Sequence, residues 1–399
     1  MVDTIPVARP PLSSSDDLDA VQVLDHLVRR AASAGASDIH IEPKREGLRV
    51  RFRIDGVMVS QGQLPLELAP SLTSRVKVLA RMDMTERRLP QDGQFSLDLG
   101  GGPLVHLRAS TFPAIHGETL VLRVLLGHQM IPLEKIGMGP DDLARAKRLA
   151  ERPTGLIVVC GPTGSGKTST LYSLLKVMNT TELSVVTLED PIEVEFGEIT
   201  QGQTNVRQGF TFAAGLRSIL RQDPDVILVG EMRDAETAQI CLQASLTGHL
   251  VLSTLHTSDA VETVTRLIDL GVEPWIVANS LLAVLAQRLV RVVCEACAEK
   301  HELEQDLADE DGKPLLLKGT ELRRAKGCAR CHQTGYRGRT AIFEMLEIGD
   351  DIRELIKTRA AKRAYRDKIR EAGLVPLREA AVAKAKAGIT SLEEVLRVT

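Results

Sequence analysis

One glycine-rich stretch constrains this 399-residue chain more than any other feature. Residues 161–168 have the sequence GPTGSGKT and match the pattern G-x-x-x-x-G-K-[S/T]. The stretch lies between an apolar run at Leu156–Cys160 and a helical pattern at Lys167–Asn179. Glycines let the backbone curl until its N–H groups converge on phosphate oxygens at a helix start, where the helix dipole is positive. The sequence therefore predicts a phosphate-binding loop made of Gly161, Pro162, Thr163, Gly164, Ser165, Gly166, Lys167, Thr168 and Ser169.

Two side chains of this loop have expected roles of their own. The ammonium group of Lys167 is expected to neutralise the β- and γ-phosphates of a nucleotide such as ATP. The hydroxyl of Thr168 is expected to bind Mg²⁺. ATP and Mg²⁺ are therefore the expected ligands of this loop.

Strands and helices alternate from residue 141 onward. Continuous apolar runs are typical of strands buried on both faces, and they occur at Leu156–Cys160, Val185–Leu188 and Val226–Val229. Helical patterns occur at Lys167–Asn179, Phe212–Arg221, Ala235–Leu246 and Asp259–Leu270. The alternation predicts an α/β fold with a parallel sheet.

Acidic side chains follow two of these apolar runs. Glu231 comes after Val226–Val229, and the cluster from Glu189 to Glu193 comes after Val185 to Leu188. Carboxylates at the ends of neighbouring strands can bind a metal ion and orient a water molecule. Either acidic group could supply the general base, Glu231 from one and Glu189 or Glu193 from the other. The sequence leaves that choice open.

Two histidines flank a further apolar stretch, one in LTGH and one in TLHT. His256 lies beyond the end of the stretch with a hydroxyl side chain near it on either side, so we expect it to sense or hold a γ-phosphate. For His249 a structural role is as plausible as a functional one.

Four of the six cysteines form two C-x-x-C pairs with 30 residues between the pairs. Two such pairs can close a tetrahedral zinc site, so we expect Zn²⁺ on Cys294, Cys297, Cys328 and Cys331, in a structural role. The acid-rich segment Glu299–Gly312 between the pairs is expected to be a floppy insertion. Cys160 and Cys241 lie in apolar runs and are expected in the core.

The residues before the α/β region have the pattern of a separate α+β unit. Leu48–Ile54 alternates apolar residues with arginines and ends at Asp55-Gly56, a strong hairpin signal. A helix is expected at Leu68–Met82, with further strands at Gln94–Leu99, Val105–Ser110 and Thr119–Leu125. A stretch rich in glycine and proline, 126–140, is expected to be a linker.

Composition narrows the class of function. The net charge of −3 and the 3% content of aromatic residues argue against a dedicated nucleic-acid-binding protein. The chain shows neither a signal-peptide pattern nor an 18-residue uncharged apolar run, so we expect a cytoplasmic protein.

Four motifs together carry a specific resemblance. GPTGSGKT, TLEDPIE, RQDPDVILVGEMRD and LTGHLVLSTLHT, in this order and spacing, resemble the secretion ATPases of bacterial type II secretion and type IV pilus systems. In that superfamily the second and fourth motifs are called the Asp box and the His box. The resemblance continues upstream through ASDIHIEP, RFRIDG, RLPQDGQF and HGETLVLRVL, and downstream through LAQRLVR and GYRGRTAIFE. It therefore covers about residues 20–399.

The resemblance implies an architecture and a function. It implies a PAS-like amino-terminal domain, a RecA-like ATPase core and a homohexameric ring that hydrolyses ATP to drive pseudopilus or pilus assembly. The implied partner is a polytopic inner-membrane platform protein, which places the chain in the cytoplasm, peripheral at the inner membrane. Arg108 and Arg123 match family arginines that reach a neighbouring subunit's nucleotide, and Arg217 and Arg221 match core arginines near the phosphates. From the residues alone, Arg108 and Arg123 would only be polar positions on strands.

The expected organisation follows from these patterns together. It consists of a disordered amino terminus at 1–15, a PAS-like domain at 16–125, the linker at 126–140, a RecA-like core at 141–293, a zinc module at 294–336 and a helical region at 337–399.

The chain departs from the family at its amino terminus, because relatives usually carry a further domain there that docks on a membrane partner. Either this chain recruits its partner differently or it is a truncated form. Two other functions stay open: a P-loop motor that moves nucleic acid, and a nucleotide-gated scaffold that does not hydrolyse. The sequence does not choose between a secretion pseudopilus and a type IV pilus.

Overall fold

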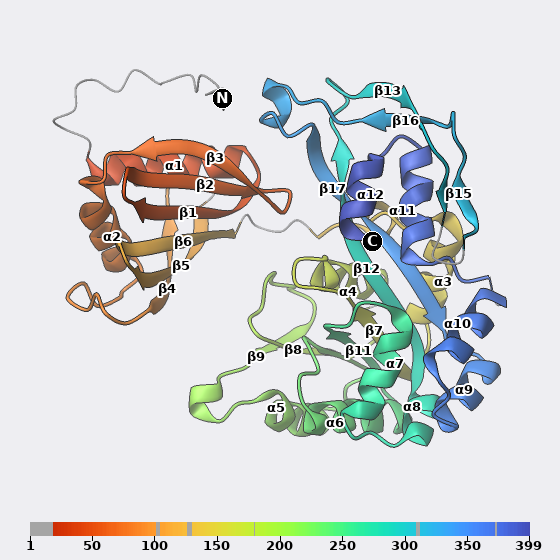
Figure 1. Ribbon diagram of the computed structural model, residues 1–399. Helices are drawn as coiled ribbons and strands as arrows, with labels where there is room; N and C mark the ends of the chain where they lie inside the picture. The colour runs from red at the N-terminus through yellow and green to blue at the C-terminus, as the bar shows by residue number, and fades with distance from the viewer. Residues whose placement is uncertain (1–18, 101–103, 126–129, 179, 309–311, 372) are drawn as a thin grey trace. The chain divides into compact units, whose positions relative to one another are not determined.

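The computed structural model describes residues 19–100, 104–125, 130–178, 180–308, 312–371 and 373–399. The chain divides into two compact units, Met1–His128 and Gln129–Thr399 (Figure 1). The expected disordered segment 1–15 and the first part of the expected linker lie outside the described residues.

The first unit is an antiparallel sheet of six strands with two helices. The strand order is β3-β2-β1-β6-β5-β4. The elements are α1 (Ala20–Ser33), β1 (Ala36–Lys44), β2 (Gly47–Ile54), β3 (Val57–Leu64), α2 (Leu68–Leu79), β4 (Gln91–Leu97), β5 (Val105–Ala114) and β6 (Gly117–Leu125). The predicted strands are all present, and so is the helix predicted at Leu68–Met82, which is α2. The hairpin signal at Asp55-Gly56 implied a strand after β2, which is β3, but β1 on the other side of β2 was not predicted.

The alternation in β2 behaves as its sequence predicts. Leu48, Val50, Phe52 and Ile54 are buried in the core that also holds α1 and α2. The arginines between them therefore lie on the opposite, polar face. Asp55 and Gly56 both have positive φ, 49° and 84°, as a two-residue hairpin turn requires.

The second unit is built on a seven-stranded sheet in the order β17-β12-β7-β11-β10-β8-β9. Its strands are β7 (Gly155–Cys160), β8 (Val185–Glu189), β9 (Thr200–Gln203), β10 (Val226–Val229), β11 (Leu250–Leu255), β12 (Leu281–Val293) and β17 (Tyr336–Glu347). All neighbouring pairs are parallel except β12 with β17. The α/β class with a parallel sheet is confirmed.

Helices cover both faces of this sheet (Figure 1). They are α3 (Pro140–Ala150), α4 (Lys167–Val177), α5 (Phe212–Ile219), α6 (Ala235–Leu246), α7 (Ala260–Asp269) and α8 (Pro274–Ser280), with short 3₁₀ turns at Leu133–Lys135, Val206–Gln208 and Ala329–Cys331. Every residue of β7 is buried, with Val158 in one core and Val159 in the other. This two-sided burial explains why β7 is apolar without interruption.

The carboxyl-terminal part differs from the expected helical region. Residues 337–347 belong to β17, which pairs with β12 along almost its whole length. Helices follow only afterwards, as α9 (Asp350–Lys357), α10 (Lys362–Glu371), α11 (Leu377–Lys386) and α12 (Leu392–Val398). The prediction failed because more than 40 residues separate β12 from β17, and a strand pairing so distant in sequence leaves no local pattern.

The segment between the cysteine pairs is also more ordered than predicted. Glu299–Glu302 forms β13 and pairs with β16 (Glu321–Arg324), and Leu307–Ala308 forms β14 and pairs with β15 (Pro314–Leu316). The expected floppy insertion is therefore wrong for the described residues; residues 309–311 lie outside them. Among the described residues, no helix has the length and apolar character needed to cross a membrane.

Candidate functional site

The predicted site residues of the second unit lie where parallel strands end. β7, β11, β10 and β8 are neighbours in the sheet and run in the same direction, so their carboxyl ends meet at one edge. Hydrogen bonds join these ends: Gly161 N–H donates to Leu255 O at 3.3 Å, and Gly230 N–H donates to Leu188 O at 2.8 Å. Open α/β sheets bind ligands at this edge.

The glycine-rich loop leaves β7 at Gly161 and enters α4 at Lys167. Gly161, Gly164 and Gly166 have backbone φ angles of +149°, +78° and +85°, which residues other than glycine rarely adopt. A Cβ atom on Gly161 would lie 2.4 Å from the backbone oxygen of Gln287. The glycines are therefore needed for the turn and for close packing against β12.

Within the loop, the side chains differ in exposure. Pro162, Thr163 and Gly164 are exposed, whereas Ser165 and Lys167 are buried. Thr168 and Ser169, in the first turn of α4, are half-buried. The Ser165 Oγ is buried and makes no hydrogen bond within the described structure.

The Lys167 ammonium folds back onto the loop. Its Nζ donates to the backbone oxygens of Gly161 at 2.9 Å and Pro162 at 3.1 Å. Burial lowers the pKa of Lys167, and the carboxylate of Glu231 opposes that shift. The positive charge of Lys167 is thus held inside the curve of the loop.

The side chain of Gln287, on β12, contacts both the loop and α4. It was not among the predicted site residues. Its Nε2 donates to Ser165 O at 2.7 Å, and its Oε1 accepts from Thr170 Oγ1 at 2.7 Å. The Gln287 side chain is 2% exposed. A polar amide inside the apolar run of β12 was the available signal, because a buried amide needs partners.

Glu231 lies one residue beyond Gly230 at the end of β10 and contacts two basic side chains. Arg233 Nη2 is 2.5 Å from Glu231 Oε1, and His256 Nε2 is 3.2 Å from Oε2. Burial by itself raises the pKa of Glu231, but the contacts with Arg233 and His256 outweigh it and hold that pKa below its ordinary value. Arg233 is a second residue that the sequence reasoning missed.

Glu189 at the end of β8 is in a different environment. It is 2% exposed, and its carboxylate accepts hydrogen bonds from Thr187 Oγ1 at 2.7 Å, Gln201 Nε2 at 3.1 Å and the hydroxyl of Tyr172. Burial and the contact with Glu189 raise the pKa of Tyr172. Glu193 lies further along the loop and is exposed. The three predicted carboxylates are therefore not equivalent.

Of the predicted core arginines, Arg217 contacts α6 and Arg221 contacts the backbone of α5. Arg217 forms an ion pair with Glu236, and Arg221 Nη1 donates to the backbone oxygen of Arg217 at 2.6 Å. Both side chains are exposed, and these contacts do not join them to the phosphate loop. His249 Nδ1 donates to Ala244 O of α6 at 2.9 Å, which fits the structural alternative.

The other two predicted arginines lie in the first unit, opposite each other on β5 and β6. Arg108 is the register partner of Arg123. Arg108 is half-buried, and the exposed Arg123 donates from Nε to Asp38 Oδ1 at 3.0 Å.

The four predicted metal ligands come together in space. The sulfurs of Cys294, Cys297, Cys328 and Cys331 all lie within 4.8 Å of one another. Individual Sγ–Sγ distances are 4.0 Å for Cys294–Cys328, 3.8 Å for Cys297–Cys331 and 3.7 Å for Cys328–Cys331. Zinc–sulfur bonds of about 2.3 Å place tetrahedral sulfurs about 3.8 Å apart, so the cluster fits that ion. The backbone N–H of Gly335 points at Cys331 Sγ, 3.2 Å away.

The remaining two cysteines are core residues, as predicted. Cys160 and Cys241 are both fully buried. Burial raises their thiol pKa values to about 11 and about 12, which keeps both thiols protonated and unreactive.

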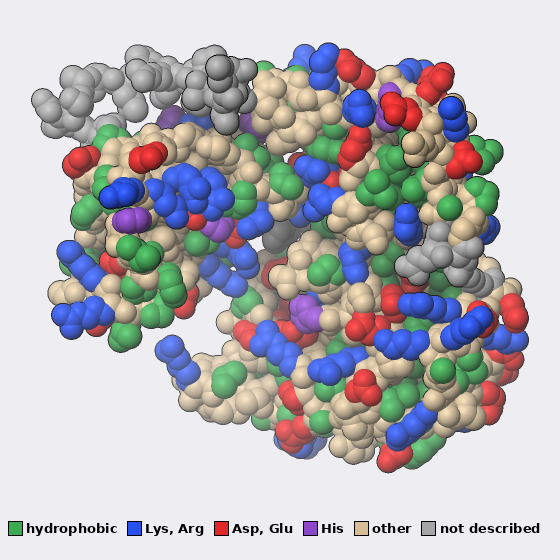
Figure 2. Space-filling model, viewed as in Figure 1, with side chains coloured by type: hydrophobic (Ala, Val, Ile, Leu, Met, Phe, Trp, Pro, Cys, Tyr) green, Lys and Arg blue, Asp and Glu red, His purple; other side chains and the backbone are tan. Residues whose placement is uncertain are grey.

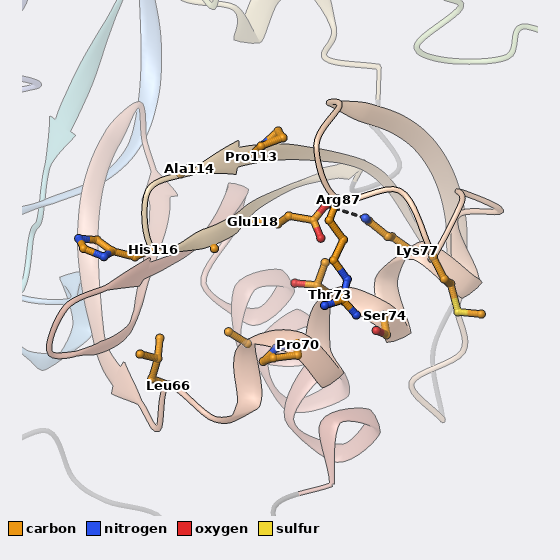
Figure 3. Close-up of a pocket in the computed structure, with 13 residues that line it drawn as sticks. Leu66, Pro70, Thr73, Ser74, Lys77, Arg87, Pro113, Ala114, His116 and Glu118 are labelled. Atoms are coloured by element: carbon orange, nitrogen blue, oxygen red, sulfur yellow. Dashed lines mark ion pairs between the residues drawn. The ribbon is translucent and has the colours of Figure 1, made fainter.

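A separate pocket of about 280 Å³ lies in the first unit, between α2 and the β5–β6 turn (Figure 3). Its lining includes an ion pair of 2.6 Å between Lys77, which is 1% exposed, and Glu118. Because each charge neutralises the other, the pocket offers a ligand little uncompensated charge at that point.

The second unit therefore has the fold and the glycine-rich loop of a P-loop nucleotide-binding protein. A family model described as "Type II/IV secretion system protein" matches residues 13–397. The chain belongs to this family.

Individual relatives agree with that assignment. The chain is 47% identical to the type II secretion system ATPase E of Vibrio cholerae over 403 residues, covering 100% of this chain and 79% of the relative. It is 43% identical to the type IV pilus assembly ATPase PilB of Myxococcus xanthus, covering 96% of this chain and 68% of the relative.

Solved structures give the same picture. The pilus retraction motor PilT, solved with bound ADP, matches with a TM-score of 0.62 at 26% identity, covering 94% of this chain and 96% of that one. The ATPase DotB of Legionella pneumophila matches in fold, with a TM-score of 0.71 at 22% identity over 97% of each chain. The predicted resemblance to secretion ATPases is confirmed, and so is the predicted enzyme class, an ATPase.

Proposed function

We propose that this protein is a cytoplasmic, hexameric motor that hydrolyses ATP at the inner membrane to drive assembly of a secretion pseudopilus or a type IV pilus. The observation that carries the proposal is the single sheet edge where the glycine-rich loop, Glu231 and His256 meet. The partner would be a polytopic inner-membrane platform protein. The first unit would be PAS-like and the second RecA-like, in keeping with the ATPase relatives.

The loop residues would hold the nucleotide. Backbone N–H groups between Gly161 and Thr168 would donate to phosphate oxygens, and Lys167 would leave its carbonyl partners to neutralise the β- and γ-phosphates. The Thr168 hydroxyl would hold Mg²⁺, which polarises the phosphates when bound.

Glu231 is the carboxylate that best suits a general base. Its side chain is 14% exposed, and its negative charge acts on Lys167, so it lies close to the reacting phosphate. Glu189 already accepts three hydrogen bonds, which leaves it little capacity to take a proton from water. Glu189 would instead hold the end of β8 in place, and His256 would orient Glu231 and contact the γ-phosphate.

The cysteine cluster would bind one structural Zn²⁺. Four sulfurs at distances suited to a tetrahedron leave no open position for a substrate. The ion would fasten the residues that follow β12 to those that precede β17.

Arg108 and Arg123 would complete a neighbouring subunit's site in the ring. Arginines supplied from outside the phosphate loop stabilise the transferred phosphoryl group and are worth about 10³- to 10⁵-fold in related motors. Arg217 and Arg221 would act near the phosphates of their own chain only after Arg217 leaves Glu236 of α6 and Arg221 leaves the backbone oxygen of Arg217.

A mixing experiment tests both halves of the proposal. Lys167→Ala lacks a working loop but keeps Arg123, and Arg123→Ala has the reverse defect. Each variant alone should bind its neighbours yet lose Mg²⁺-dependent ATP hydrolysis. Mixed rings should regain activity at interfaces where an intact loop meets an intact arginine. Normal turnover by Lys167→Ala would rule out this loop as the site. Mixed rings without activity would rule out the action of Arg123 across subunits.

A further inference from the structure

A row of charged side chains crosses the polar face of the first unit's sheet. In register, Arg53 of β2 pairs with Asp38 of β1, Asp38 pairs with Arg123 of β6, and Arg123 pairs with Arg108 of β5. Figure 2 shows basic side chains gathered over this unit. Within the row, Asp38 contacts Arg53 and Arg123, and Arg108 lies on the far side of Arg123.

The Asp38 carboxylate is held on several sides. Its Oδ1 accepts from Arg123 Nε at 3.0 Å, and its Oδ2 accepts from Ser37 Oγ at 2.8 Å and lies 3.6 Å from Arg53 Nε. Asp38 is only 5% exposed. A buried carboxylate with fixed partners has a single orientation. The arginine that donates to it is therefore restricted in position as well.

A β-bulge in β1 determines the face of the sheet on which Asp38 lies. The β1–β2 register shifts between Ala36 and Asp38, so Ser37 is an extra residue in β1. Because of this bulge, Ala36 faces the core while Asp38 lies on the polar face. Bulges re-aim side chains, and this one brings the Ser37 hydroxyl to Asp38.

The contact with Asp38 leaves much of Arg123 available. It uses Nε, on a side chain that is 62% exposed, and an arginine has four further N–H donors on its terminal nitrogens. Like charges directly opposite on neighbouring strands repel, so Arg108 alone would push Arg123 aside. Asp38 offsets that repulsion and holds the guanidinium in one place.

We propose that Asp38 is a positioning residue, which acts through Arg123 to fix the guanidinium for phosphate contact. This inference rests on the proposed function of Arg123. An arginine that is ordered before the reaction stabilises developing charge without reorganising. Loss of Asp38 should therefore reduce turnover more than ATP binding.

The chain offers a matched control on the same strand. Glu42 lies on the same face of β1, and its carboxylate contacts Arg49 Nε at 2.9 Å and Arg51 Nη2 at 2.8 Å. Its side chain is nearly as buried, 15% exposed against 7% for Asp38. Glu42→Gln should therefore destabilise the unit about as much as Asp38→Asn, but without touching Arg123.

The test compares steady-state ATP hydrolysis by the full-length assembled variants, with melting temperature and oligomeric size measured alongside. Asp38→Asn should lower kcat about 10- to 100-fold, the range that follows from a small misplacement, with KM for ATP nearly unchanged. Glu42→Gln should lower the melting temperature but keep kcat. Asp38→Glu retains the charge and should recover part of kcat. An Asp38→Asn kcat equal to that of Glu42→Gln would overturn the inference.

A double variant separates this inference from the function on which it rests. If Asp38 acts through Arg123, Asp38→Asn should cause no further loss of kcat in an Arg123→Ala background. An additive loss would show that Asp38 acts by another route. Normal kcat in Arg123→Ala alone would instead contradict the proposed role of the arginine. In that case a low kcat in Asp38→Asn would also overturn the positioning role.

Discussion

The phosphate loop and the cysteine cluster lie in the same unit but are ordered in different ways. The loop is fixed by the chain itself, through Gln287 at 2.7 Å from Ser165 O and through Lys167 at 2.9 Å from Gly161 O. The four sulfurs of the cluster lie within 4.8 Å of one another, where the chain passes from β12 to β13 and from β16 to β17. A zinc ion bound by these four thiols would hold the two cysteine pairs together.

These two ways of ordering predict different roles for the nucleotide at the loop and for an ion at the cluster. At the loop, the surroundings are already packed, so a nucleotide would only have to draw Lys167 from its carbonyl partners, and much of its binding energy can be used for chemistry. At the cluster, a bound zinc ion would contribute folding energy to the module. Substitutions at the loop should thus reduce catalysis with little change in structure. Substitutions at the cluster should change the structure with little effect on nucleotide binding.

The largest effect is expected from the carboxylate of Glu231, which follows β10 at the same sheet edge as the loop. Glu231→Gln should bind ATP normally but lose about 10²- to 10⁴-fold in kcat, the usual worth of a general base. The amide keeps the shape of the side chain but does not accept the proton. Nucleotide affinity and single-turnover hydrolysis check this prediction.

Glu189→Gln provides the matched comparison. Its partners Tyr172 and Thr187 should make it chiefly a stability variant, with a lowered melting temperature and a smaller loss of kcat. If Glu189→Gln abolished turnover and Glu231→Gln did not, the assignment of the base would be reversed.

An intermediate effect is expected at the cluster. Each chain should carry one zinc ion, and Cys297→Ser or a strong chelator should remove it. Hydrogen exchange should then rise in β13 and β16, while ATP affinity stays unchanged because the loop is held by Gln287. Elemental analysis and exchange mass spectrometry make the measurement. Global unfolding, or metal-free protein with unchanged exchange, would contradict the comparison.

The smallest effect concerns pH. Arg233 helps to hold the pKa of Glu231 below its ordinary value, so the basic form of Glu231 persists at lower pH. Arg233→Ala should raise that pKa, and the acid limb of the kcat profile should move to higher pH. Loss of Arg233 should leave activity near neutral pH almost intact. An unmoved acid limb would show that Glu231 is not the titrating base.

Sequence patterns were most informative where neighbours along the chain decide the structure. The buried run of β7, the loop Gly161–Thr168 and the Asp55-Gly56 turn are all local features, and the structure contains them. The cysteine spacing likewise predicted that four sulfurs would meet. The first three patterns need only a few consecutive residues, whereas the two cysteine pairs, 30 residues apart, were joined by the four thiolates that a zinc site requires.

Residues that act through distant partners were missed. Gln287 lies 122 positions from Ser165, and Asp38 lies 85 from Arg123. Arg233 is close to Glu231 in sequence, but only the fold shows that its guanidinium reaches the carboxylate. The strand β17 was taken for helix because its partner β12 lies beyond the cysteine module.

The sequence by itself determined the phosphate loop, the α/β class, the four clustered cysteines and the family. Only the fold shows the surroundings of each carboxylate: Glu189 is enclosed by Tyr172, Thr187 and Gln201, whereas Glu231 faces Arg233 and His256. Both acids follow apolar strands, so their local patterns are alike. Their contacts differ because the strand order of the sheet gives them different neighbours.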